Sequence, residues 1–71
     1  MKLPLLTGAE IVKILKKLGF QEIRQRGSHQ YPRHQDGRAT VVPIHSHDVG
    51  RGLLKKILND ADVTREEFLG F

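Results

Sequence analysis

Residues 24–31, with the sequence RQRGSHQY, carry side chains that could act on RNA. Imidazole side chains in general titrate near neutral pH, so a histidine such as His29 can take a proton from one oxygen and give a proton to another. RNA cleavage needs both transfers, one from the 2′-hydroxyl and one to the leaving 5′ oxygen. Arg24 and Arg26 precede the histidine, and guanidinium groups suit the negative charge that develops on the phosphoryl oxygens. A histidine with two arginines on an open sheet face could form a minimal ribonuclease site, and such a site requires no metal.

Three further positions could contact the same substrate. Ser28 could orient His29 or bond a phosphate, and Lys55 or Lys56 could approach from a helix. Tyr31 could stack on a base or a ribose, although a strand tyrosine more commonly packs across its sheet. The alternative for His29 itself is a solvent-exposed strand histidine without a special role. The residues alone leave both interpretations of His29 open.

His45, His47 and Asp48, with His34, could instead be considered a metal site. Their spacing does not match a fixed ligand pattern such as two histidines on one helical face. A polar loop over 45–48, with Asp48 capping or favouring the start of the next helix, explains these residues better. We therefore expect neither a metal nor another cofactor.

Two helices are predicted on either side of these residues. Thr7 and Glu10 have the spacing of a capping box, and apolar residues then recur at helical spacing, which predicts a helix over about 8–18 that ends at Gly19. A similar apolar pattern predicts a helix over 49–61, with Leu54, Ile57, Leu58 and Ala61 on its buried face. A second capping box at Thr64–Glu67 predicts a short last turn that buries Phe68 or Leu69.

Three strands are predicted between the helices. Alternating polarity indicates a strand over 20–26, Gly27 interrupts it, and 28–33 can pair back on it. Asp36-Gly37 predicts a type I′ hairpin turn, and the β-branched stretch 39–44 predicts a third strand. Pro43 lacks an N–H, so it should lie near the end of that strand or on a sheet edge.

The expected fold is therefore α+β, with the order α-β-β-β-α: a three-stranded antiparallel sheet with two helices on one face. Double-stranded-RNA-binding domains share this layout. The other face of the sheet is left to solvent or a ligand, and the polar residues of 24–31 should point that way.

Composition limits the function classes. A chain of 71 residues forms one domain, spanning 1–71, and its 12 Lys and Arg against 8 Asp and Glu give a net charge of +4. This balance suggests a polyanionic partner. Cysteine is absent, and no stretch approaches the roughly 20 apolar residues of a membrane helix. We expect a cytoplasmic protein without a membrane partner.

Four stretches of the sequence resemble motifs of one known family, and they occur in the same order as in that family. They are TGAEIVKILKKLGF, RQRGSHQY, TVVPIH and LLKKILNDADVTREEF. The sequence is similar to the HicA toxins, small mRNA interferases of prokaryotic toxin–antitoxin pairs. The Gly-Ser-His element after a strand of basic residues is the most distinctive part. Where the family often has Ala-Gly after its second helix, this chain has Ala61-Asp62, and Asp tolerates a left-handed cap.

The resemblance implies a double-stranded-RNA-binding-like fold and metal-independent cleavage of mRNA. The catalytic histidine of the family falls on His29, flanked by Gly27 and Ser28. An antitoxin similar to HicB is the implied protein partner, covering this face. Two other functions fit the same residues: a non-catalytic RNA-binding module, which would bind RNA without cutting it, and a domain that only docks another protein.

Overall fold

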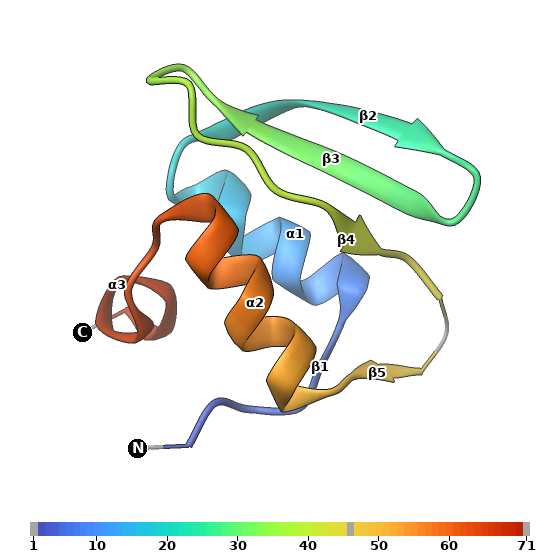
Figure 1. Ribbon diagram of the computed structural model, residues 1–71, viewed down its shortest axis with the longest axis vertical. Coiled ribbons are helices and arrows are strands. Elements are labelled where there is room, and N and C mark those ends of the chain that lie inside the picture. The colour runs from blue at the N-terminus through green and yellow to red at the C-terminus, as the bar shows by residue number, and fades with distance from the viewer. Residues whose placement is uncertain (1, 46, 71) are drawn as a thin grey trace.

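The computed structural model describes residues 2–45 and 47–70, and the predicted α+β fold is confirmed. Its elements in chain order are β1 (Leu6–Thr7), α1 (Gly8–Lys17), β2 (Phe20–Arg26), β3 (His29–His34), β4 (Val42–Pro43), β5 (Asp48–Val49), α2 (Arg51–Ala61) and α3 (Arg65–Leu69). The main sheet is antiparallel with the order β2-β3-β4. Figure 1 shows the β2–β3 hairpin along one side of the molecule and both long helices on the other side.

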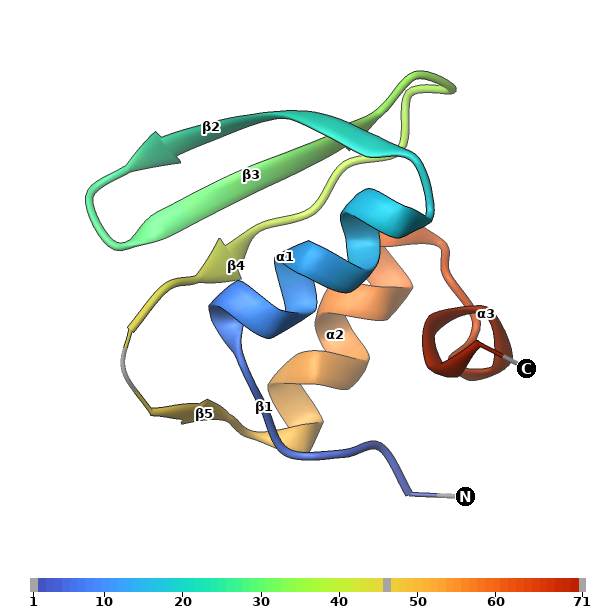
Figure 2. The same ribbon diagram turned by 180° about the vertical axis from the view of Figure 1, so that it is seen from behind.

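A single core fills the space between the sheet and the helices. Its buried side chains come from the sheet, all three helices and the segments beside them: Leu3, Ile11, Val12, Leu15, Phe20, Val42, Val49, Leu54, Ile57, Leu58, Ala61, Val63 and Phe68. Seen from behind, α1 lies in front of α2 beneath the same sheet (Figure 2). The buried Thr40 links the two layers, since its hydroxyl donates to the Ile57 carbonyl of α2 at 3.2 Å. Among the described residues, no helix is long and apolar enough to cross a membrane.

The helix caps predicted from the sequence are confirmed at both ends of the chain. The Thr7 side chain accepts from the Glu10 N–H, and the Glu10 carboxylate accepts from the Thr7 N–H. Thr64 and Glu67 make the same reciprocal pair at α3, which buries Phe68. Asp62 caps α2 in the left-handed region at φ 53°, as an aspartate can.

The start of α2 differs from the prediction. Asp48 and Val49 were predicted to end a loop and to begin the helix. They instead form β5, in which Asp48 pairs with Thr7 and Val49 with Leu6. Val49 is β-branched and almost fully buried, which favours an extended conformation here. The helix then begins after Gly50, which makes no side-chain cap, so Asp48 does not cap α2. Ser46 lies outside the described residues.

The turn at Asp36-Gly37 is not type I′. Gly37 has φ 101°, but Asp36 does not have the positive φ that a type I′ turn would need at both central positions. The Gly37 N–H donates to the His34 carbonyl, and the His34 N–H donates to the Arg38 carbonyl. This is a three-residue hairpin loop, a turn followed by one left-handed glycine. The hairpin itself was correctly predicted.

The third strand is shorter than the predicted 39–44. Only Val42–Pro43 form β4, with an isolated bridge between Arg33 and Ala39 in the same register. Between them Thr40 donates to the Pro32 carbonyl, and Pro32 has no N–H to return the bond. Pro43 lies on the edge strand, as predicted.

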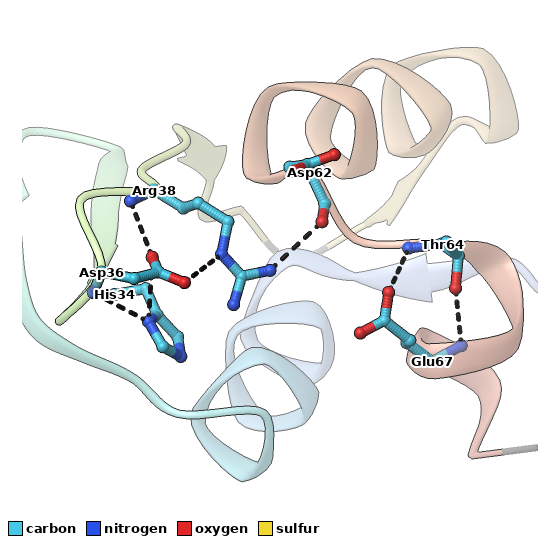
Figure 3. A network of polar contacts seen from close by, with 6 residues as sticks. All are labelled: His34, Asp36, Arg38, Asp62, Thr64 and Glu67. Atoms are coloured by element: carbon cyan, nitrogen blue, oxygen red, sulfur yellow. Dashed lines mark hydrogen bonds and ion pairs between the residues drawn. The ribbon is translucent and has the colours of Figure 1, made fainter.

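A polar network joins the hairpin loop to the C-terminal end of α2 (Figure 3). The Asp36 carboxylate accepts from the Arg38 N–H and side chain, at 3.0 and 2.8 Å, and Arg38 also donates to the Asp62 carbonyl at 3.1 Å. The Arg38 guanidinium lies over the Phe20 ring, 5.3 Å from its centroid. The loop is thereby held to the helical layer at the end of the sheet away from Gly27.

Candidate active site

Strand register decides which side chains share a face of the sheet. Residues directly opposite each other in an antiparallel pair lie on one face, and neighbours along a strand alternate. Gln30 pairs with Val42, and Val42 is fully buried, so this pair faces the helices. His29 pairs with Arg26 on one side and with Pro43 on the other, so these three residues lie on the opposite, outer face. The predicted outward orientation is therefore confirmed for Arg26 and His29, whereas Gln30 and its partner Gln25 lie on the face toward the helices.

Arg24, Arg26 and Tyr31 come together on this outer face. Arg24 pairs with Tyr31 across the hairpin, and all three residues line an open concavity of about 1090 Å³, together with Arg33. The arginines are exposed, and Tyr31 is half-buried. Within the part of the chain that the structure describes, no ion pair neutralises Arg24, Arg26 or Arg33. Their charge is available to a polyanion.

His29 lines a second, smaller concavity of about 320 Å³ beside the first. Val41 and Asp60 line both, so the two concavities adjoin each other. The His29 side chain is exposed, and no hydrogen bond to another described side chain or backbone group holds its ring. An imidazole in this position can approach the sugar and phosphate of a bound strand.

Ser28 lies in the turn just before His29 and is exposed. Its carbonyl accepts a hydrogen bond from the Ile44 N–H, which continues the β3–β4 pairing beyond β4. Its hydroxyl points to no partner among the described residues, so the structure brings Ser28 near His29 without assigning it a contact.

The two candidate lysines of α2 are placed differently. Lys56 lines the concavity that contains His29, and its ammonium pairs with Asp60 at 3.0 Å. Lys55 lines a separate concavity with Lys2, Arg51 and Gly52, at the N-terminal end of α2. The structure therefore does not bring Lys55 to His29. Its contact with RNA stays a prediction, and Lys56 is the lysine beside the histidine.

The geometry does not support the alternative of a metal site made by His34, His45, His47 and Asp48. His34 packs edge-on against Phe20, with ring centroids 5.2 Å apart, and its Nδ1 contacts Asp36. His45 stacks on His47 instead. Among residues 2–45 and 47–70, no three histidine or carboxylate side chains are grouped so that they could hold a metal ion.

Sequence reasoning missed Arg33, which lines the larger concavity, and it also missed His45. His45 lines the smaller concavity together with His29, although the sequence pattern placed it in a loop. No sequence signal could have found His45, because the position follows from the observed register, in which His29 pairs with Pro43 and a residue two positions later lies on the same face of an extended chain.

Comparison with known proteins gives one positive result. A family model described as the HicA toxin of bacterial toxin–antitoxin systems matches residues 8–63, which include all the strands of the main sheet and α2. A search of curated proteins found no match.

Proposed function

We propose that this chain, which belongs to the HicA toxin family of bacterial toxin–antitoxin systems, cleaves mRNA with His29 as its general acid/base. The toxins of this family are mRNA interferases, which are RNases. The observation that carries the proposal is the placement of His29: an exposed imidazole on the outer face, directly opposite Arg26 and next to the arginine-lined concavity.

The chemistry follows from this placement. A base removes the proton of the 2′-hydroxyl, the 2′ oxygen attacks phosphorus, and the leaving 5′ oxygen takes up a proton. An imidazole is a side chain that can serve as either base or acid in such a step. Arg24 and Arg26 stabilise the additional negative charge on the phosphoryl oxygens in the transition state, and their donors match phosphate geometry.

The substrate contacts are built on the same face. Arg24, Arg26 and Arg33 line the concavity beside the histidine and would hold consecutive phosphates of a strand. The half-buried Tyr31 exposes part of its ring there and can stack on a base or ribose. Ser28 adds a hydroxyl next to His29. No metal takes part in this proposal, because the transition-state charge is met by guanidinium groups.

The protein partner in this proposal is an antitoxin similar to HicB, encoded beside the toxin. Its binding to the outer face would cover His29 and the arginines together, which blocks RNA from both. Added antitoxin should therefore inhibit cleavage and RNA binding in parallel. Inhibition of cleavage with RNA binding unchanged would show that the antitoxin binds outside the outer face of the sheet.

The test is cleavage of a single-stranded RNA by the purified protein in excess EDTA, beside the same RNA carrying 2′-O-methyl groups. We expect the first RNA to be cut to products ending in a 2′,3′-cyclic phosphate or its hydrolysis product, and the second to be bound but uncut. Binding of both RNAs without any cleavage would contradict the proposal and favour a non-catalytic RNA-binding module. Activity that requires a divalent cation would contradict its metal-independent part.

A further inference from the structure

RNA cleavage requires two proton transfers, and a second imidazole lines the same concavity as His29. The two histidines line one concavity of about 320 Å³, one from β3 and the other from the segment after β4. We infer that His45 is a second catalytic residue, so that His29 and His45 each carry one of the two proton transfers. This inference rests on the proposed function as an RNase.

Backbone pairing fixes the position of His45 relative to His29. His29 lies opposite Pro43, and the Ile44 N–H donates to the Ser28 carbonyl one step further along the two chains. His45 follows directly after this last hydrogen bond. The pairing therefore places residues 29 and 45 at the same end of the main sheet, next to the turn at 27–28.

Two contacts orient the His45 ring. Its Nδ1 lies 3.3 Å from the His47 carbonyl oxygen. A carbonyl oxygen only accepts, so Nδ1 carries a hydrogen and Nε2 is left as the nitrogen that exchanges a proton with the substrate. The ring also stacks on that of His47, with centroids 3.8 Å apart and planes 9° from parallel.

The other charged groups of the concavity are less suited to the second transfer. Lys56 and Asp60 of α2 line it as well, and they pair with each other across one helical turn. An imidazole exchanges protons near neutral pH, whereas an exposed ammonium group retains its proton there. The apolar part of the wall contributes no proton carrier and consists of Val41, Pro43, Leu53 and Ile57.

The step balances with these two groups alone. One neutral imidazole takes the 2′-hydroxyl proton while the bond from the 2′ oxygen to phosphorus forms. The bond from phosphorus to the 5′ oxygen breaks, and the other histidine, as imidazolium, gives its Nε2 proton to that oxygen. The products are a 2′,3′-cyclic phosphate and a 5′-hydroxyl, and no co-reactant is consumed.

The experiment compares His29→Ala, His45→Ala and wild type on two RNAs that share one sequence. One is ordinary RNA, and the other has a sulfur in place of the leaving 5′ oxygen at one cleavage site, because a thiolate departs without being protonated. His34→Ala serves as the matched histidine control, since His34 lies on β3 but packs against Phe20 away from the concavity. Circular dichroism and RNA binding are recorded for each variant.

On ordinary RNA we expect His29→Ala and His45→Ala each to lose about 10²–10⁴-fold in cleavage rate with binding retained, while His34→Ala keeps its activity. On the sulfur-substituted RNA one of the two alanine variants, and only one, should recover, which identifies the acid. Wild-type rates for a folded His45→Ala, or loss in both variants without recovery of either, would overturn the inference while leaving the proposed function intact. Absence of cleavage by wild type would overturn both.

Discussion

Arg24 and Arg26 lie on the outer face without a carboxylate partner among the described residues, so their charge should act on RNA and not on stability. Arg26 is the closer of the two to His29, because these residues face each other across the hairpin. The proposed function depends on a few exposed side chains, so their replacement should change RNA binding or cleavage without changing the free energy of unfolding.

We expect Arg26→Ala to weaken binding of single-stranded RNA and to reduce the slope of log K against log salt by about 0.7, the value for one lost phosphate contact. The free energy of unfolding should stay within about 0.5 kcal/mol of wild type, as for other surface positions. Lys13→Ala on the exposed face of α1 is the matched control. An equal slope in the two variants would remove Arg26 from the RNA interface.

Replacement of Gly19 and of Gly52 by alanine should have opposite effects on the free energy of unfolding. Gly19 has φ 100°, and a Cβ there would lie 2.7 Å from Nε2 of His34. Gly52 has open space around it in the first turn of α2. Gly19→Ala should therefore cost about 1–2 kcal/mol or more of unfolding free energy, whereas Gly52→Ala should raise it by about 0.4–1 kcal/mol. Urea denaturation measures both, and a neutral Gly19→Ala would contradict the backbone assigned here.

The elements are bounded by hydrogen bonds that depend on ionised carboxylates. The Thr64 N–H lowers the pKa of Glu67 below its ordinary 4.5, the Thr7 N–H does the same for Glu10, and the Arg38 N–H lowers the pKa of Asp36 below 3.8. The folded chain therefore binds fewer protons than the unfolded chain around these values. Their contribution is complete above pH 4.5 and is lost as the pH falls through the lower, folded pKa values.

Acid titration of stability tests the caps directly. We expect the urea midpoint of wild type to fall as the pH drops below 4.5. Glu67→Gln should fall less steeply, because glutamine can still accept at this position of a capping box without titrating. Parallel curves for the two proteins would show that Glu67 ionisation does not stabilise α3.

Thr64→Ala removes the other half of the same cap. The Glu67 N–H then loses its acceptor at 3.1 Å, and we expect a loss of about 1 kcal/mol in unfolding free energy at neutral pH. RNA cleavage should be unchanged at a temperature where the variant is folded, since α3 lies away from the outer face of the sheet (Figure 1). A loss of activity in the folded variant would mean that the C-terminal helix contributes to the site.

For the whole molecule, local signals predicted most of the fold. Both capping boxes, the helix end at Gly19, the hairpins and the buried face of α2 follow from short-range spacing, and all are present. The β1–β5 pairing was missed because two-residue strands have no periodicity to detect. The short β4 was missed because its limit is set by Pro32 on a neighbouring strand, which only the register reveals.

The candidate site shows the same division between local and long-range information. Alternation along one strand correctly predicted that Arg24 and Arg26 share the outer face. The choice between Lys55 and Lys56, and the approach of His45, depend on how α2 and the segment after β4 lie against the sheet. Those positions follow from packing of the core and cannot be deduced from spacing within one element.

The rate of RNA cleavage in EDTA by His29→Ala, measured beside wild type and His34→Ala, is the most direct test of the proposed role of His29. We expect a loss of about 10²–10⁴-fold for His29→Ala, with RNA affinity and thermal stability retained because the His29 ring is exposed and makes no bond among the described residues. A folded His29→Ala that cleaves RNA at the wild-type rate would contradict this role and remove His29 from the mechanism.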